Sequence, residues 1–159
     1  MNFRVGLGFD LHRLGPNTPL TLGGIVIPHP LGLIGHSDGD VLCHAITDAL
    51  LGAAGIGNIG ELFPDTDPAL KGISSLSFLE KSVALVRAKG FEIGNIDSNI
   101  LAERPKLLSY FPAMTDQIAS ALAITPGKIQ VKAKTMEGVG VIGTEQAIAA
   151  EAVALIFSE

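Results

Sequence analysis

The feature that most constrains the fold is an alternating run near the start of the chain. Apolar side chains recur at every second position from Phe3 to Phe9, where the stretch FDLH begins. A period of two is the signature of a half-buried β-strand, whose side chains at i and i+2 leave on one face. The run therefore predicts a strand that buries its apolar face, and it places Asp10 and His12 side by side at the strand end. Such a pair is either a hydrogen-bonded carboxylate and imidazole or two metal ligands that need a third.

A second informative stretch, HSDGDVLCHAITDALLGAAG at 36–55, predicts an amphipathic helix. Its apolar arc consists of Leu42, Ala45, Ile46, Ala49, Leu50 and Ala53. Asp40, His44 and Asp48 recur every four residues, within about 80° of one another and away from that arc. We therefore do not expect His44 to be a core histidine.

Asp10, His12 and His44 together supply three ligands of types that suit zinc. Three protein ligands leave one position of a tetrahedral ion for water or a substrate oxygen, which is the pattern of catalytic sites. Spacing alone leaves two alternatives open. In the first, His44 is an ordinary surface histidine. In the second, His29 in its proline-flanked turn completes a closed structural site.

The composition is apolar for a chain of this size. Of its 159 residues, 17% are charged and 47% are hydrophobic, and the mean hydropathy is +0.43. This length suits one domain with a sizeable core. A lone subunit with so few charges would struggle to cover itself with polar surface, which indicates an oligomer with an apolar interface.

Charge, hydropathy and cysteine content limit which binding partners and which cellular compartment we expect for this protein. The net charge is −5 and the basic residues are scattered, so nucleic acid is not an expected partner. The longest apolar stretch, AIAAEAVALIF, is interrupted by Glu151 and is too short to span a bilayer, and the first residues lack the pattern of a signal peptide. Cys43 alone excludes an intrachain disulfide and is typical of a small buried hydrophobe. We expect a cytoplasmic protein with no membrane partner.

Turn signals and periodicity divide the rest of the chain into short elements. We expect a hairpin over 20–27 turning at Gly23 and Gly24, a functional loop over 55–73, helices over about 75–89 and 110–123, and strands within 95–103 and 128–135. The helix of the 36–55 stretch should be capped by Ser37 or Asp38 and end at Gly55.

Two segments near the end of the chain have signals that do not point to one structure or function. Residues 145–157 are ambiguous, because their alanines favour a helix while their β-branched and aromatic end favours a buried strand. The stretch GVGVIG at 138–143 spells G-x-G-x-x-G. It leaves no room for a βαβ unit, so we reject a dinucleotide site there.

Five stretches, taken in order, resemble one known family. They are GFDLHRL, GHSDGDVLCHAITDALLGAAG, NIGELFPDTDP, ERPKL and KAKTMEGVG, spread over nearly the whole chain. Their joint order is similar to that of the 2-C-methyl-D-erythritol 2,4-cyclodiphosphate synthases of the non-mevalonate isoprenoid pathway. The combination of H-S-D-G-D-x-x-x-H with F-P-D-T-D is highly specific.

The resemblance implies a fold and an assembly. The fold would be α/β, an α+β sandwich with a mixed sheet and helices packed on one face, formed by residues 1–159 as a single domain. Relatives of this kind are homotrimers with sheets facing the threefold axis and active sites between subunits. That arrangement favours a strand for residues 147–157 and would account for the excess of apolar residues.

The resemblance also implies a reaction. Such enzymes convert 4-diphosphocytidyl-2-C-methyl-D-erythritol 2-phosphate to the 2,4-cyclodiphosphate and release CMP, which is phosphorus-oxygen lyase chemistry. Asp10, His12 and His44 would bind Zn²⁺, in agreement with the spacing argument. Glu137 would bind a second divalent ion, Mg²⁺ or Mn²⁺, between the substrate phosphates.

Roles in binding and catalysis follow in the same way. His36 and Ser37 would hold the methylerythritol phosphate, and the catalytic set would be His36, Lys134 and Thr135, which offset developing charge. The backbone of 102–108 would bind cytosine. The full substrate-binding set implied is Asp10, His12, His36, Ser37, Asn58, Ile59, Gly60, Phe63, Pro64, Asp65, Thr66, Asp67, Ala102, Glu103, Arg104, Pro105, Lys106, Leu107, Leu108, Lys134, Thr135, Met136, Glu137, Val141 and Thr144.

The sequence departs from the commonest family pattern at two places. Asn58 stands where many members have an aspartate that meets the ribose. Val141 and Thr144 stand where many members have an aromatic residue and an arginine beside a central trimer cavity. The first change bears on nucleotide affinity and the second on binding of isoprenoid diphosphates.

Two other functions compete with the synthase. One is a non-catalytic trimeric module that binds zinc or a nucleotide, in which a metal only joins subunits and a fourth protein ligand is expected. The other is a zinc-dependent phosphohydrolase acting on a nucleotide diphosphate. Product mass separates the two enzymes, because hydrolysis adds a water molecule and cyclisation does not.

Overall fold

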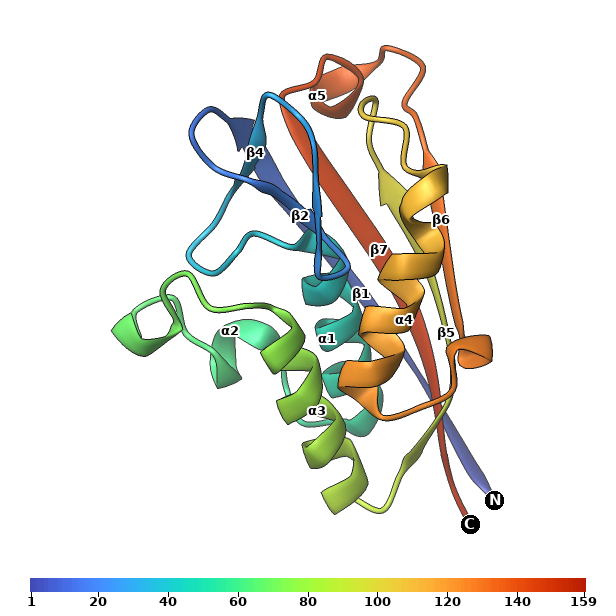
Figure 1. The fold of residues 1–159 in the computed structure, drawn as a ribbon. Helices are drawn as coiled ribbons and strands as arrows, with labels where there is room; N and C mark the ends of the chain where they lie inside the picture. The colour runs from blue at the N-terminus through green and yellow to red at the C-terminus, as the bar shows by residue number, and fades with distance from the viewer.

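A five-stranded mixed sheet runs the length of the molecule, with helices against one of its faces (Figure 1). The computed structural model describes residues 1–159. In spatial order the strands are β4 (Gly32–Ile34), β1 (Asn2–Gly15), β7 (Ala147–Ser158), β5 (Glu92–Leu101) and β6 (Ile129–Lys134). Only β5 and β6 are parallel, and the other neighbours are antiparallel. The expected mixed sheet with helices on one face is confirmed.

The helical layer consists of three longer helices and several single turns. The longer helices are α1 (Val41–Ala54), α3 (Leu76–Ala88) and α4 (Phe111–Leu122), and the short ones are α2 (Ile59–Leu62), α5 (Gly140–Gly143) and the 3₁₀ turns Pro68–Leu70, Leu108–Tyr110 and Pro126–Lys128. A separate hairpin joins β2 (Leu20–Leu22) to β3 (Ile25–Ile27). No helix is both long and apolar enough to cross a membrane.

Local sequence signals predict most of these elements. The hairpin turns at Gly23 and Gly24, whose φ angles of 58° and 75° match the left-handed pair of a primed turn. The helices expected over 75–89 and 110–123 form within about two residues of those bounds. The ambiguous segment 145–157 becomes β7, which pairs with β1 and β5 along almost its whole length.

The start of α1 differs from the prediction. Asp40 is the N-cap, and its Oδ1 accepts a hydrogen bond from Cys43 N at 3.1 Å. Ser37 and Asp38 lie before the helix, because Gly39 at φ 72° turns the chain and delays the first helical residue. The expected end at Gly55 is confirmed, where φ is 65°.

The central packing contact joins α1 to β1 through glycine. A Cβ atom on Gly6 would lie 1.9 Å from the carbonyl oxygen of Ala49, and one on Gly8 would lie 1.8 Å from that of Ala45. Helix and strand therefore touch backbone to backbone at these points. A cluster of 32 buried residues surrounds this contact and includes the expected apolar arc of α1.

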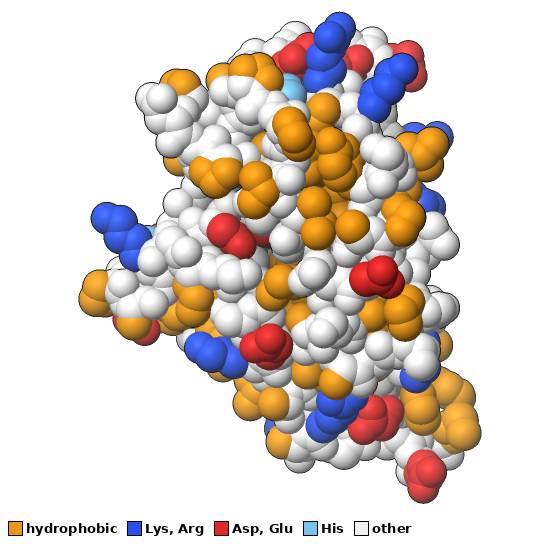
Figure 2. All heavy atoms as spheres, viewed as in Figure 1, with side chains coloured by type: hydrophobic (Ala, Val, Ile, Leu, Met, Phe, Trp, Pro, Cys, Tyr) orange, Lys and Arg blue, Asp and Glu red, His pale blue; other side chains and the backbone are white.

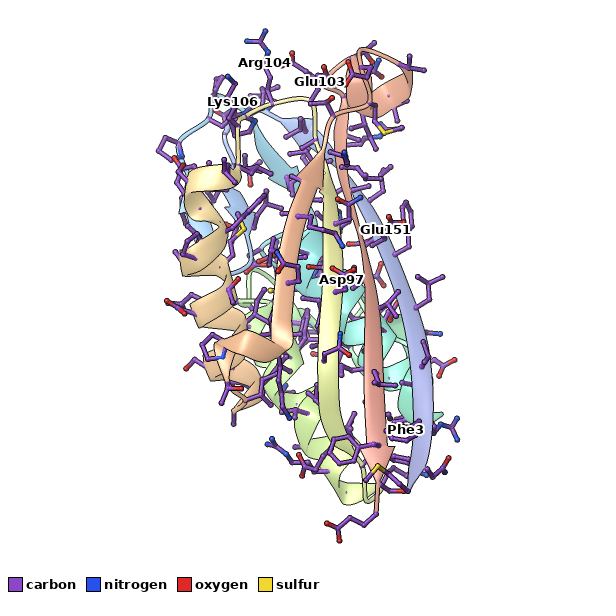
Figure 3. The ribbon with its side chains drawn as sticks, turned by 90° about the vertical axis from the view of Figure 1, so that its right-hand side faces the viewer. Phe3, Asp97, Glu103, Arg104, Lys106 and Glu151 are labelled. Atoms are coloured by element: carbon purple, nitrogen blue, oxygen red, sulfur yellow. The ribbon has the colours of Figure 1, made fainter.

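The apolar face of β1 is not buried by the helices, contrary to the expectation from its alternation. Phe3, Val5, Leu7 and Phe9 are between 56% and 71% exposed. Gly6 and Gly8 occupy the opposite face, which receives α1. A period of two determines which residues share a face but not which face is covered, and only glycine admits a helix this closely. Figure 3 looks onto the strands and labels Phe3 near the start of β1.

Replacing Gly8 with alanine should destabilise the fold strongly. The added methyl group would overlap the Ala45 backbone, and overpacking of this kind costs about 1–3 kcal/mol or more. Gly52→Ala is the matched control, because nothing lies within 4 Å of its Cβ position in α1. That control should gain about 0.5–1 kcal/mol. Urea unfolding at one protein concentration compares the two, and equal stabilities would contradict the packing argument.

Candidate metal centre and active site

Three potential metal ligands converge where the end of β1 meets α1. Asp10 and His12 project from the face of β1 that α1 covers, and His44 projects from the helix. Asp10 Oδ2 lies 3.0 Å from His12 Nε2 and 2.8 Å from His44 Nδ1. The three ligand atoms all lie within 4.8 Å of one another. The structure therefore brings together the trio that the sequence predicts.

The orientation of His12 is held from behind by β4. His12 Nδ1 lies 2.7 Å from the carbonyl oxygen of Ile34, which can only accept a hydrogen bond, so Nδ1 donates. In the neutral ring the lone pair is then on Nε2, the atom that faces Asp10. A backbone carbonyl bonded to the far nitrogen of a histidine is a common support for a metal ligand.

Asp10 and His12 shift each other's pKa in opposite directions. Burial alone raises the pKa of Asp10, but hydrogen bonds and charge from His12 and His44 outweigh it and hold that pKa well below its usual range. The hydrogen bond to Asp10 raises the pKa of His12, against the opposing effect of burial. Asp10 is therefore a carboxylate at neutral pH, between two imidazoles.

The donor set fits zinc. Zn²⁺ readily accepts both imidazole nitrogens and carboxylate oxygens, and three such ligands leave room for a further oxygen ligand. The trio opens into a pocket of about 360 Å³. Its lining residues are Asp10, His12, His36, Ser37, His44, Asp48, Ile59, Gly60, Phe63, Asp65, Leu70 and Phe78.

The polar side of α1 is less exposed than its sequence suggests. His44 is only 8% exposed, yet it belongs to the pocket rather than to the apolar core. Asp40 is fully buried and accepts from Gly24 N at 2.7 Å, so it joins the hairpin to the helix start. Burial raises its pKa. Asp48 accepts from Ile59 N at 2.7 Å and holds the beginning of α2 beside the pocket.

Half of the eight residues predicted between 58 and 67 line this pocket, namely Ile59, Gly60, Phe63 and Asp65. Phe63 stacks on Phe78 with ring centroids 4.6 Å apart, which forms an apolar wall. Asn58 caps α2 by accepting from Glu61 N at 3.1 Å, and its Nδ2 donates to the same glutamate. Pro64, Thr66 and Asp67 continue the segment, and the carbonyl of Asp67 lies 3.1 Å from His36 Nε2.

Sequence reasoning did not assign a site role to Phe78 or Ser75. Phe78 lines the pocket, and Ser75 Oγ lies 2.8 Å from His44 Nε2. Both come from the start of α3, for which the sequence signalled only a helix. His29, considered as a fourth ligand, is not part of the trio, and its Nδ1 lies 2.9 Å from the carbonyl oxygen of Leu31.

The remaining predicted residues form a second group near α5. Ala102, Glu103, Pro105, Lys106, Leu107, Lys134 and Thr135 line a separate hollow of about 100 Å³. Figure 3 shows Glu103, Arg104 and Lys106 together at this end of the sheet, and Figure 2 shows basic and acidic side chains gathered there. None of this group lines the pocket of the trio. One chain alone therefore carries the predicted site in two separate parts.

The loop that carries Glu137 is held by the loop that follows β5. Glu137 has a left-handed backbone with φ 51°, which is unfavourable for a residue with a side chain. The Glu103 carboxylate accepts from the amides on either side of it, Met136 N at 3.1 Å and Gly138 N at 3.4 Å. Thr135 Oγ1 donates to Glu137 Oε1 at 3.0 Å.

The last predicted residues lie around α5 and its flanks. Val141 is half exposed and lines a hollow with Leu11 and Arg13, away from the trio. Thr144 Oγ1 donates to the carbonyl oxygen of Gly140 at 2.9 Å. Leu108 is 77% exposed and Arg104 pairs with Glu145 at 3.3 Å.

Fold and site together define an α/β protein with a candidate catalytic metal centre that opens into a pocket with polar and apolar walls. Comparison with known proteins agrees with that class and narrows it. The chain belongs to the YgbB family, whose model matches residues 3–157.

Individual relatives cover nearly the whole chain. The 2-C-methyl-D-erythritol 2,4-cyclodiphosphate synthase of Verminephrobacter eiseniae is 54% identical over 158 residues, which are 98% of this chain and 86% of the relative. The bifunctional enzyme IspD/IspF of Albidiferax ferrireducens is 56% identical over 156 residues, 98% of this chain but 37% of the relative. Among solved structures, IspF of Plasmodium falciparum in complex with CDP has a TM-score of 0.87 at 36% identity, covering 99% of this chain and 97% of that one. The chain thus spans less than half of the bifunctional relative and most of the others.

Zinc binding should weaken as the pH falls, because zinc and a proton compete for His12 Nε2. The hydrogen bond to Asp10 raises the pKa of His12, so in the metal-free protein the ring stays charged to a higher pH than an ordinary histidine. Below that pKa, each unit of falling pH should reduce apparent zinc affinity by up to about tenfold. Calorimetry between about pH 6 and pH 8, in buffers with different heats of ionisation, measures both affinity and proton release. An affinity independent of pH would contradict this assignment.

Proposed function

We propose that this chain is a 2-C-methyl-D-erythritol 2,4-cyclodiphosphate synthase, a phosphorus-oxygen lyase that converts 4-diphosphocytidyl-2-C-methyl-D-erythritol 2-phosphate to the cyclic diphosphate and CMP. The observation that carries the proposal is the Asp10, His12 and His44 trio, which lines a pocket in a chain of this family. The names of its relatives support the same activity.

The proposed reaction is an intramolecular phosphoryl transfer. An oxygen of the 2-phosphate attacks the β-phosphorus, and the bond from that phosphorus to the oxygen of CMP breaks. The nucleophile is already anionic, so the protein needs no strong general base. Its main task is to hold the flexible substrate with the attacking oxygen in line behind the β-phosphorus.

The pocket residues are suited to one end of that substrate. His36 and Ser37 would bind the methylerythritol phosphate, and the His36 ring is oriented by its 3.1 Å contact with the carbonyl of Asp67. Asp10, His12 and His44 would hold Zn²⁺, which when bound supplies Lewis acidity to a phosphate oxygen. Asn58 and its neighbours in α2 would meet the ribose.

The second group would bind the other end of the substrate. The backbone of 102–108 would receive cytosine, while Lys134 and Thr135 would offset charge on the CMP side. Glu137 would hold Mg²⁺ or Mn²⁺. The hydrogen bonds that Glu103 accepts from Met136 N and Gly138 N would keep the Glu137 carboxylate in place. Relatives solved with CDP support a cytidine nucleotide as ligand.

The proposal requires an assembly in which the second group of one subunit meets the trio of the next. We propose a homotrimer with the sheets facing the threefold axis and residues 1–159 as one synthase domain in each subunit. The exposed apolar face of β1 supports this, because burying it against other subunits would remove a large apolar area from water. We also propose a cytoplasmic location, where the buried Cys43 thiol stays reduced.

The geometry favours a catalytic site over a structural one. A metal that only joins subunits would be expected to have a closed set of four protein ligands, and the trio has no fourth histidine, cysteine or carboxylate grouped with it. A zinc-dependent phosphohydrolase has the same open site, so only the products distinguish it from the synthase.

Mass analysis of the products tests the function directly. Purified protein with zinc, magnesium and the cytidylyl substrate should yield CMP and a cyclic diphosphate whose summed masses equal that of the substrate. A product that had gained the mass of water would identify a hydrolase. His44→Ala should release no CMP, because it removes a ligand of the trio. Full CMP release by that variant would contradict the assigned site.

A charge on the exposed face of β1 should disrupt the proposed trimer. Leu7→Asp places a carboxylate where the side chain is 71% exposed in one chain, and burying it between subunits would be costly. Val26→Asp is the matched control, since Val26 is 65% exposed but lies on the β2–β3 hairpin. Size-exclusion chromatography with light scattering should show trimers for the control and smaller species for Leu7→Asp. Trimers of both variants would contradict the proposed interface.

A further inference from the structure

We propose that Ser75 and Asp38 are positioning residues that fix the tautomer of His44, so that His44 Nδ1 keeps its lone pair for a cation. The proposal rests on the metal site assigned above and concerns residues for which neither the motifs nor the comparisons give a role. It makes the start of α3 and the turn before α1 part of the metal centre, although neither supplies a ligand.

The two residues form a short chain of hydrogen bonds behind His44. His44 Nε2 lies 2.8 Å from Ser75 Oγ, and Ser75 Oγ donates to Asp38 Oδ1. The second oxygen of Asp38 accepts from Ser75 N at 2.9 Å, so the carboxylate holds the serine at two points. Ser75 is fully buried. Water therefore does not compete for its hydroxyl group.

The direction of these bonds follows from which atoms can donate. The carboxylate of Asp38 only accepts, so the single hydrogen of the Ser75 hydroxyl points toward it. Ser75 Oγ can then only accept from His44, which requires the hydrogen of a neutral His44 ring to lie on Nε2. Ser37 Oγ also lies near, 3.0 Å from His44 Nε2 and 3.3 Å from Ser75 Oγ. With its own hydrogen directed to Ser75, Ser37 Oγ is a second acceptor for the hydrogen on His44 Nε2.

The consequence is a cluster of lone pairs that face one another. When both rings are neutral, His44 Nδ1 carries no hydrogen and lies 2.8 Å from Asp10 Oδ2, and His12 Nε2 lies 3.0 Å from the same oxygen, so either ring donates a hydrogen bond to Asp10 only when it gains a proton. Ile34 holds the hydrogen of His12 on the far side of its ring, as Ser75 does for His44. Both rings are thus turned with their acceptor atoms inward, and a proton or a divalent cation between them relieves the repulsion.

Nitrogen NMR on the metal-free protein tests the tautomer without reference to activity. Long-range ¹⁵N–¹H spectra at about pH 8, above the usual histidine range, should place the hydrogen of His44 on Nε2 in the native chain. Ser75→Ala should give a mixture of tautomers, and Ser75→Thr, which keeps the hydroxyl, should restore the native form. Ser74→Ala is the matched control, because Ser74 precedes the same helix but has no contact with His44.

Zinc affinity gives a second readout. Ser75→Ala should raise the dissociation constant for zinc about 10–100-fold, the usual effect of removing a support behind a histidine ligand. Ser75→Thr and Ser74→Ala should bind as the native chain does. If Ser75→Ala does not fold, Asp38→Asn should change the His44 tautomer and weaken zinc binding instead. The side-chain amide that this substitution introduces can donate to Ser75 Oγ and so turn the serine hydrogen toward His44.

The outcomes separate this proposal from the proposed function. A native His44 with its hydrogen on Nδ1, or a Ser75→Ala variant with native tautomer and native zinc affinity, would overturn the positioning role even if the synthase reaction is found. A native chain that shows the expected tautomer and zinc affinity but releases no CMP would leave the positioning role standing and refute the synthase.

Discussion

The close approach of α1 to β1 is the contact on which the rest of the structure depends. Gly6 and Gly8 leave no side chain between strand and helix, so the two backbones meet at contact distance. At that separation His44 on the helix reaches Asp10 at the end of the strand, with 2.8 Å between their polar atoms. A larger residue at either glycine would push the helix outward and separate the trio. Packing of the core and assembly of the site are therefore one constraint.

The surrounding residues hold Asp10, His12 and His44 in an arrangement that favours binding of a cation. Asp10 stays ionised between two imidazoles, and each ring is bonded on its far side, one to Ile34 and the other to Ser75. Acceptor atoms that are turned toward one another repel, and the surrounding fold keeps them there. Because the three ligand atoms are already held close together, little reorganisation is needed when a cation binds.

The proposed trimer would explain two features of the single chain. The apolar face of β1 is exposed, and the predicted substrate residues lie in two groups that do not meet within one subunit. An assembly that buries the strand face and brings one group to its counterpart on a neighbour would account for both. β7 continues this exposed face between β1 and β5, where Val153 pairs with Leu7 and is 43% exposed.

The sequence by itself determined the local elements and the identity of the trio, because turn chemistry and periodicity act over a few residues. Gly23 and Gly24 specify the hairpin, Gly55 ends α1, and a period of two puts Asp10 beside His12. Only the tertiary structure decided which face of β1 the helix covers, since that depends on how two surfaces fit. It also decided the partner of His44, because Ser75 lies 31 residues away in the chain and no local pattern links them.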